Sequence, residues 1–171
     1  MTFTIRPGRI EDAYGIALVQ VETWKTTYTR IVPDSYLSSL DVGLRAVKWK
    51  EQFEFDTTLI FVAESLSSIV GFVSGGKLRD AIAGYDAELY AIYVLQAEQR
   101  RGLGKMLTQK LVGALHAKGH QSLIVWVLEK NPSVGFYAHL GGSPVAQKQI
   151  EIGGAKLTEI AFGWLGLDNL L

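Results

Sequence analysis

The middle of the chain constrains the fold most, because a strand pattern, a helix pattern and a second strand pattern follow one another there. Residues 88–95 form a long β-prone run, which predicts an extended strand. Apolar residues recur at three- and four-residue steps over 102–118, which predicts an amphipathic helix that ends at Gly119. The apolar run at 122–128 predicts a second strand, and a helical crossover makes it parallel to the first.

Shorter patterns around this unit predict a mixed sheet with helices. Regular alternation in the first strand puts Leu89, Ala91, Tyr93 and Leu95 on one face, and Glu88, Tyr90, Ile92 and Val94 on the other. Further strands are expected at 3–6, 58–63, 69–74, 144–151 and 155–164, and further helices at 12–27, 34–39, 43–54 and 132–140. The expected class is α/β or α+β. Since no linker or repeat interrupts the chain, one domain over residues 1–171 is expected.

Composition excludes several classes of function. The 17 Lys and Arg residues balance the 17 Asp and Glu residues, which argues against a polybasic surface for nucleic acid or membranes. The chain has no cysteine, so it has no disulfide, no cysteine-ligated metal and no thiolate nucleophile. The first seven residues lack the layout of a signal peptide, and no apolar run approaches the ~20 residues of a membrane helix. A soluble, cytoplasmic protein is expected.

The junction between the strand at 88–95 and the helix beginning near Gly102 predicts an anion site. Gly102 and Gly104 allow a tight backbone turn with outward N–H groups, and the helix N-terminus adds unpaired donors. Arg100, Arg101 and Lys105 add positive charge nearby. The pattern is neither Gly-x-Gly-x-x-Gly nor a P-loop, and a basic, glycine-rich helix start without a ligand is the alternative.

Gln99-Arg100-Arg101-Gly102-Leu103-Gly104 resembles the Gln/Arg-x-x-Gly-x-Gly/Ala motif of the GNAT (GCN5-related N-acetyltransferase) superfamily. Three other segments resemble the family in the same order: the opening at 5–13, the fourth strand at 88–94, and the Asn…Phe-Tyr segment at 131–142. In the last of these, Gly142 replaces the final Phe of the family pattern. The resemblance covers almost the whole chain. It implies a mixed, mostly antiparallel sheet of about seven strands flanked by about four helices.

The resemblance also implies a V-shaped cleft between the strands at 88–95 and 122–128, in which acetyl-CoA lies. Its pantetheine would bond to backbone groups of the first strand, and its pyrophosphate would sit on the glycine-rich loop. The implied cofactor residues are Ile92, Tyr93, Val94, Gln99, Arg100, Arg101, Gly102, Leu103, Gly104, Lys105, Asn131 and Phe136. No metal is expected, because His116, His120 and His139 show no metal-ligand spacing.

Acetyl transfer needs a proton acceptor, because a lysine-like amine has a pKa of about 10.4. By its spacing to Gln99, Glu88 resembles the glutamate base of the histone-acetylating branch of the family. The alternative is a solvated charge at a strand end, with Asp86, Glu22 and Glu151 as rival bases.

Tyr137 matches the family tyrosine that protonates the departing thiolate. A phenol with a pKa of about 10 can do so for a thiol with a pKa of about 8.5. The alternative is that Phe136 and Tyr137 form only a packed aromatic pair. A backbone N–H near 92–94 would meet the oxyanion, and the absence of cysteine favours direct attack on the thioester over an acyl-enzyme.

The acceptor is a primary amine of a small molecule or peptide if the resemblance holds. In the family it contacts the first two helices and the last hairpin. These carry Trp24, Thr27, Tyr28, Trp49 and Phe53, with Glu22, Asp34, Glu51, Asp86 and Glu151 as charge partners. Aromatics with carboxylates suit a cationic amine, although such aromatics are more often core. The segment 24–33 resembles small bacterial GNAT proteins of varied substrate.

Two other functions compete with this one. The first is a non-catalytic acyl-CoA-binding or regulatory module on the same fold, which the presence of both Glu88 and Tyr137 disfavours. The second is a nucleotide or nucleic-acid binder that uses the glycine-rich loop. Zero net charge and the lack of a ribose-binding acid at the Rossmann spacing disfavour it. Family members often dimerise, so a homodimer is an expected state.

Overall fold

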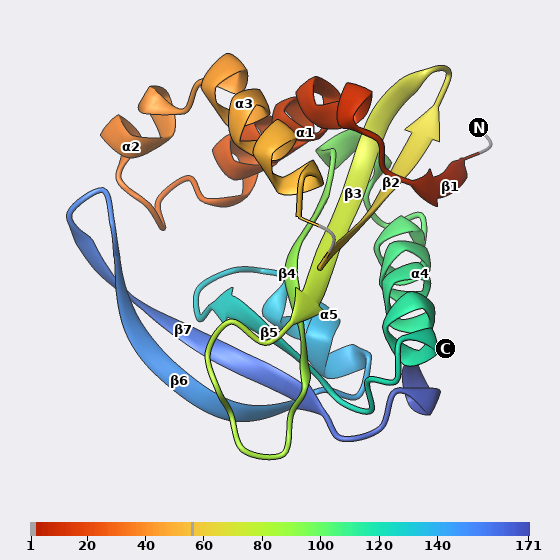
Figure 1. Ribbon diagram of the computed structural model, residues 1–171. Helices are drawn as coiled ribbons and strands as arrows, with labels where there is room; N and C mark the ends of the chain where they lie inside the picture. Colours follow the sequence, from red (N-terminus) through yellow and green to blue (C-terminus); the bar gives the residue numbers. More distant parts are fainter. Residues whose placement is uncertain (1–2, 56) are drawn as a thin grey trace.

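The computed structural model describes residues 3–55 and 57–171, and a seven-stranded sheet runs through this part of the chain (Figure 1). The strand order is β1-β2-β3-β4-β5-β7-β6. Neighbouring strands are antiparallel except β4 and β5, which are parallel as the crossover predicted. The strands are β1 (Thr4–Pro7), β2 (Thr58–Ser65), β3 (Ser68–Lys77), β4 (Ala87–Val94), β5 (Leu123–Leu128), β6 (Ser143–Ile152) and β7 (Ala155–Trp164).

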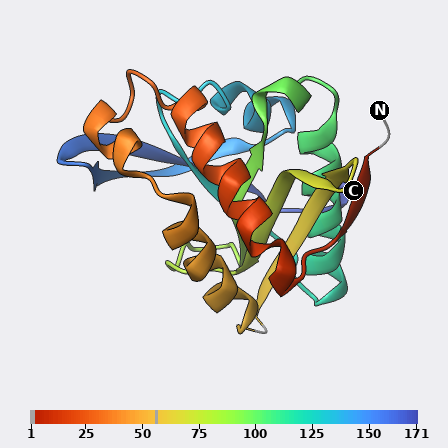
Figure 2. The same cartoon turned by 90° about the horizontal axis from the view of Figure 1, so that it is seen from above.

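Helices cover both faces of the sheet (Figure 2). The described residues form five α-helices, against the approximate four that the family resemblance implied: α1 (Ala13–Thr27), α2 (Asp34–Ser39), α3 (Val42–Phe53), α4 (Leu103–Ala117) and α5 (Val134–His139). One apolar core lies between α4 and the sheet, and a second lies beneath α1 and α3 on the opposite face. Within the described residues, no helix combines the length and the hydropathy needed to cross a membrane.

A β-bulge changes which side chains share a face of β4. Leu89 pairs with Gly75, but the next residue of β3, Ser74, pairs with Ala91, so Tyr90 is the extra residue. Beneath α4 lie Leu89, Ile92 and Val94, and toward α1 lie Ala91 and Tyr93. The predicted alternation, with Leu89 on the face of Ala91 and Tyr93, is therefore wrong, because the bulge shifts the period of two by one residue.

Strands β4 and β5 pair over a short distance and then separate. Two residue pairs join them, Glu88 with Ile124 and Leu89 with Val125. Beyond these pairs the two strands line opposite sides of a cavity, which confirms the predicted splay.

Asp86 connects the starts of β4 and β5, at the end where the two strands pair. Its carboxylate accepts hydrogen bonds from the backbone N–H of Gln121 at 2.9 Å and of Ser122 at 3.0 Å, and also from the Ser122 hydroxyl. Burial acts to raise the Asp86 pKa, but these hydrogen bonds outweigh it and lower the pKa. Asp86 is a structural bridge between two strands, which argues against it as the rival base.

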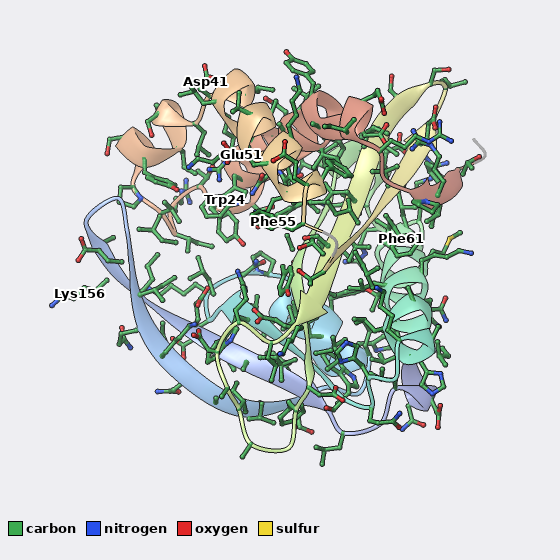
Figure 3. All side chains as sticks on the ribbon, viewed as in Figure 1. Trp24, Asp41, Glu51, Phe55, Phe61 and Lys156 are labelled. Atoms are coloured by element: carbon green, nitrogen blue, oxygen red, sulfur yellow. The ribbon has the colours of Figure 1, made fainter. Side chains whose placement is uncertain are left out.

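The β6–β7 hairpin reaches back to the first helices. A third apolar cluster joins residues after α1 and in α2 to the hairpin through Tyr28, Leu37 and Leu157. At the hairpin turn, Gly153 has a φ of 58°, and a Cβ there would lie 2.7 Å from the Cβ of Tyr36. Lys156 lies on β7, two residues after the turn of this hairpin, and Trp24 lies on α1 (Figure 3). The hairpin and the end of α1 both line the cavity, and α2 packs against them through the third cluster.

Candidate active site

A cavity of about 1100 Å³ occupies the splay between β4 and β5. Its walls come from the end of α1, the loop after β3, β4, the start of α4, β5, α5 and the β6–β7 hairpin. One end reaches the glycine-rich loop before α4, and the other reaches charged residues of the hairpin. The glycine-rich loop and the charged residues of the hairpin therefore line one shared cavity.

The glycine-rich loop has the geometry of an anion cradle. Gly102 adopts a φ of 80° as the N-cap of α4, and it leaves the first N–H groups of the helix without a side-chain cap. Arg100 is also left-handed, with a φ of 63°, so the chain turns sharply before the helix. The Gln99 side chain donates a hydrogen bond to the Val94 carbonyl at 2.9 Å, which ties the loop to the end of β4. With Arg100 and Lys105 lining the cavity, the loop fits a pyrophosphate.

Most of the residues predicted to hold the cofactor line this one cavity. They are Ile92, Tyr93, Val94, Gln99, Arg100, Gly102, Leu103, Gly104, Lys105, Asn131 and Phe136, together with Tyr137. The side chain of Arg101 stands apart from them. It forms an ion pair with Glu98 and lies over the Phe3 ring at 4.8 Å, so it fastens the loop to the N-terminal segment instead.

Tyr137 is buried on α5 and lines the cavity. Its ring contacts Phe136 at a centroid distance of 5.3 Å and Phe162 at 6.1 Å. Burial, reinforced by the neighbouring Tyr93, raises the pKa of the phenol well above its ordinary value. The hydroxyl therefore keeps its proton throughout the neutral range, as a proton donor requires.

A polar network links α1 to the opposite wall. The Asn131 side chain donates a hydrogen bond to the Tyr28 hydroxyl at 3.0 Å and accepts one from the Ser133 N–H at 2.8 Å. Nearby, the Trp24 indole N–H donates to the Tyr93 hydroxyl at 3.0 Å. The predicted Asn131 is thus held in place by its own neighbours, and these hydrogen bonds connect the end of α1 to β4 and to the segment after β5.

Glu88 is buried, with 1% of its side chain exposed, and forms a salt bridge with Arg79. The Arg79 backbone N–H donates to one carboxylate oxygen at 3.1 Å, and the guanidinium donates twice to the other. Of the β4 residues, Leu89 to Val94 line the cavity, and Glu88 does not. The base role of Glu88 stays a prediction, and both of its carboxylate oxygens are occupied by hydrogen bonds from Arg79.

Two of the other predicted acceptor contacts belong to the core. Trp24, Thr27 and Tyr28 line the cavity as expected. Trp49 instead points from α3 into the core, where its indole N–H donates to Gln20 at 2.8 Å, and Phe53 contacts the same core. Glu22, Asp34, Glu51 and Glu151 are exposed and lie outside the cavity lining.

Four charged residues of the cavity were missed by sequence reasoning: Arg79, Asp80, Lys148 and Glu159. Lys148 and Glu159 form a cross-strand pair between β6 and β7. The alternation of side chains along β6 could have revealed Lys148, because Lys148 lies on the same face as Ile150 and Ile152. The predicted Glu151 lies on the opposite, exposed face with Gln149. Arg79 and Asp80 lie in a loop and carry no such signal.

The histidines do not assemble a metal site. His139 lines the cavity, while His116 lies 4.0 Å from Asp168 and His120 lies 3.7 Å from Asp86. Across residues 3–55 and 57–171, no group of three or more His, Asp or Glu side chains is arranged to hold a metal ion.

Comparison with known sequences places the chain in a family. Residues 69–150 match the family model described as FR47-like protein. The chain is also 41% identical over 168 residues to a Bacillus subtilis (strain 168) protein named "Uncharacterized N-acetyltransferase YuaI", and the match covers 98% of this chain and 95% of that protein.

Solved structures share the fold. The PaiA N-acetyltransferase of Thermoplasma acidophilum, solved with coenzyme A, matches 94% of this chain and 98% of its own, with a TM-score of 0.68 and 24% identity. The YncA structure of Salmonella typhimurium, solved with acetyl-CoA, matches 98% and 95%, with a TM-score of 0.72 and 20% identity. Fold, motif order and the identity to the Bacillus protein agree: this chain belongs to the GNAT superfamily of N-acetyltransferases.

Proposed function

We propose that the protein is an acetyl-CoA-dependent N-acetyltransferase that moves an acetyl group directly to a primary amine of a small molecule or peptide. The observation that carries this proposal is the single cavity that joins the anion cradle at Gly102 to Tyr137 and then to the charged residues of the hairpin. The 41% identity to a protein named as an N-acetyltransferase supports it.

The cradle would hold the pyrophosphate of acetyl-CoA through the N–H groups at the start of α4, with Arg100 and Lys105 adding charge. A Cβ at Gly104 would lie 3.4 Å from the Phe136 ring, so the start of α4 packs closely against α5 on this wall of the cavity. Bound acetyl-CoA supplies the thioester from which the acetyl group is taken. The unpaired stretch of β4 after Leu89 would offer backbone groups to an extended ligand.

Tyr137 would donate its phenolic proton to the departing sulfur. Its position on the cavity wall supports this role, and its phenol is protonated at neutral pH, before the thiolate forms. The chain has no cysteine to carry an acyl group, so the amine attacks the thioester carbonyl directly.

Thiol release from acetyl-CoA tests the function, measured against polyamines, aminoglycosides, amino acids and peptide N-termini. We expect release that depends on an amine, and acetyl-CoA should raise the melting temperature. The variant Gly104→Glu should fold but lose both effects, because a carboxylate would enter the cradle.

Two outcomes would contradict the proposal. A rise in melting temperature with CoA, but no thiol release with any amine, would identify a non-catalytic binding module. A rise with NAD or ATP but none with CoA would identify a nucleotide-binding protein.

A further inference from the structure

We infer that Glu159 receives the acceptor: its carboxylate pairs with the incoming ammonium and takes the first proton from it. This inference rests on the proposed function and names the acceptor-binding residue of that same cavity.

Glu159 lies where three structural elements meet at the end of the cavity. It sits on β7, opposite Leu128 at the end of β5 and opposite Lys148 on β6. Its side chain is 20% exposed and lines the cavity. It lines the same cavity as Tyr137, Trp24 and the part of β4 that is not paired with β5, so an amine held at Glu159 lies in the cavity that also holds the acyl-transfer groups.

The charges around Glu159 are unevenly paired. The three carboxylates are Asp80, Glu88 and Glu159, and the two cations are Arg79 and Lys148. Arg79 is committed to Glu88 by its ion pair. Lys148 lies 3.2 Å from Asp80 but 4.0 Å from Glu159, and its ammonium sits over the Trp126 ring at 4.2 Å.

Glu159 is therefore the carboxylate of this group with the weakest ion pair. The five side chains leave one unit of negative charge uncompensated, and a monocationic ammonium would balance it. The acceptor consequently enters as a cation.

The surroundings of Glu159 also suit a proton acceptor. Burial raises its pKa, Glu88 raises it further, and Lys148 and Arg79 counteract part of the rise. Asp80 lies on the far side of Lys148, and the β5 residues of the cavity wall, Val125–Leu128, carry no charge. A carboxylate with a raised pKa holds a proton more readily than an ordinary one, which favours transfer from the ammonium.

The proton and bond changes balance without a further reactant. The ammonium passes one proton to the Glu159 carboxylate, and the resulting amine attacks the thioester carbon. A C–N bond forms and the C–S bond breaks. Tyr137 gives a proton to the sulfur and regains one from the attacking nitrogen through solvent, while Glu159 releases its proton to bulk water. The products are the acetamide, free thiol and one proton.

Steady-state kinetics of Glu159→Gln against pH test the inference. The acceptor is the amine of highest kcat/KM among the polyamines, aminoglycosides, amino acids and peptides above. We expect kcat/KM for this amine to fall on the order of 10²-fold, with loss of the acidic limb of its pH profile. Glu159→Asp should keep the limb and part of the activity. The KM for acetyl-CoA should stay unchanged in both.

Glu129→Gln is the matched control, because this exposed glutamate follows Leu128 and lies outside the cavity lining. It should behave as wild type. Lys148→Met gives a second test that needs Glu159 intact. Removing the cation raises the Glu159 pKa, so the acidic limb should move to higher pH.

The outcomes separate the two proposals. Wild-type kinetics and an unchanged acidic limb in Glu159→Gln would overturn the inference while leaving the enzyme function in place. An unshifted limb in Lys148→Met would also overturn it. Absence of thiol release by the wild type with every amine would overturn the proposed function, and the inference with it.

Discussion

Arg79 donates three hydrogen bonds to the carboxylate of Glu88, two from its guanidinium and one from its backbone N–H. The carboxylate is buried, whereas 59% of the arginine side chain is exposed. The pair therefore holds the loop after β3 against β4, at the edge of the cavity. Glu88 therefore anchors Arg79. A variant of Glu88 can distinguish this structural role from the role of a catalytic base.

Glu88→Gln should lower the free energy of unfolding by about 1–2 kcal/mol, because an amide retains only part of these hydrogen bonds. It should keep the acidic limb of the kcat/KM profile, since that limb belongs to Glu159. Urea unfolding at neutral pH and amine kinetics from pH 5 to 9 measure the two effects. Loss of the acidic limb in Glu88→Gln would instead return the base role to Glu88.

Tyr137→Phe should reduce kcat on the order of 10²-fold, because it removes the proton donor for the leaving thiolate. The ring contacts with Phe136 and Phe162 survive the change, so the melting temperature should move little. Because burial raises the phenol pKa, the wild type should show no alkaline limb from this residue below about pH 10.

Single-turnover thiol release measures the kcat effect, with Tyr14→Phe as a control on the exposed face of α1. Equal rates for Tyr137→Phe and the wild type at every pH would remove the acid role from Tyr137.

The salt bridge between Arg6 on β1 and Asp12 should make the free energy of unfolding depend on pH in the acidic range. The Arg6 guanidinium, which donates two hydrogen bonds to Asp12 at 2.7 and 2.9 Å, is the main cause that lowers the Asp12 pKa. A lowered carboxyl pKa contributes stability above the unfolded value of about 3.9, and this contribution is lost as the pH falls through the folded value.

Asp12→Asn should therefore cost about 1–2 kcal/mol at pH 7 and progressively less below pH 4. Urea midpoints of both proteins across this range measure the difference. A difference in unfolding free energy between the wild type and Asp12→Asn that stayed constant down to pH 2 would contradict this account.

The contact between the hairpin turn at Gly153 and Tyr36 of α2 can be tested for its effect on acceptor binding. Gly153→Ala would place a Cβ within 2.7 Å of Tyr36, so the hairpin must move away from α2. The KM for the amine should rise several-fold, whereas the KM for acetyl-CoA should not change, because the cradle lies at the other end. Stability should fall by about 1–3 kcal/mol.

Gly154→Ala is the matched control. Its φ of 82° brings similar backbone strain, but no atom lies within 4 Å of the added Cβ. A rise in amine KM of equal size in both variants would show that backbone strain, and not the contact with Tyr36, is responsible.

The parts of this molecule that depend on local sequence were predictable. The apolar period over 102–118 and the glycine at its start predicted α4 and its cradle, and the crossover predicted the parallel pair of β4 and β5. The faces of β4 were not predictable, because a bulge at Tyr90 has no signature in a strand of large apolar residues.

The charged end of the cavity depends on register between distant segments. Glu159 pairs with Lys148 only because β6 and β7 pair in one particular register, and the charge of Arg79 acts on its pKa only because the folded sheet brings the loop after β3 near β7. Glu151 looked equivalent in the sequence, yet it alternates to the outer face.

The separation of β4 from β5 leaves two strand edges facing each other inside the sheet, and not at its rim. Exposed edges at a rim invite pairing with another chain, which can lead to aggregation. Here residues of α5, α1 and the hairpin line the gap together with the two strands. In the proposed complex with acetyl-CoA, these edges would contact the ligand through main-chain N–H and C=O groups, so the side chains of β4 stay available to pack the two cores on either face of the sheet.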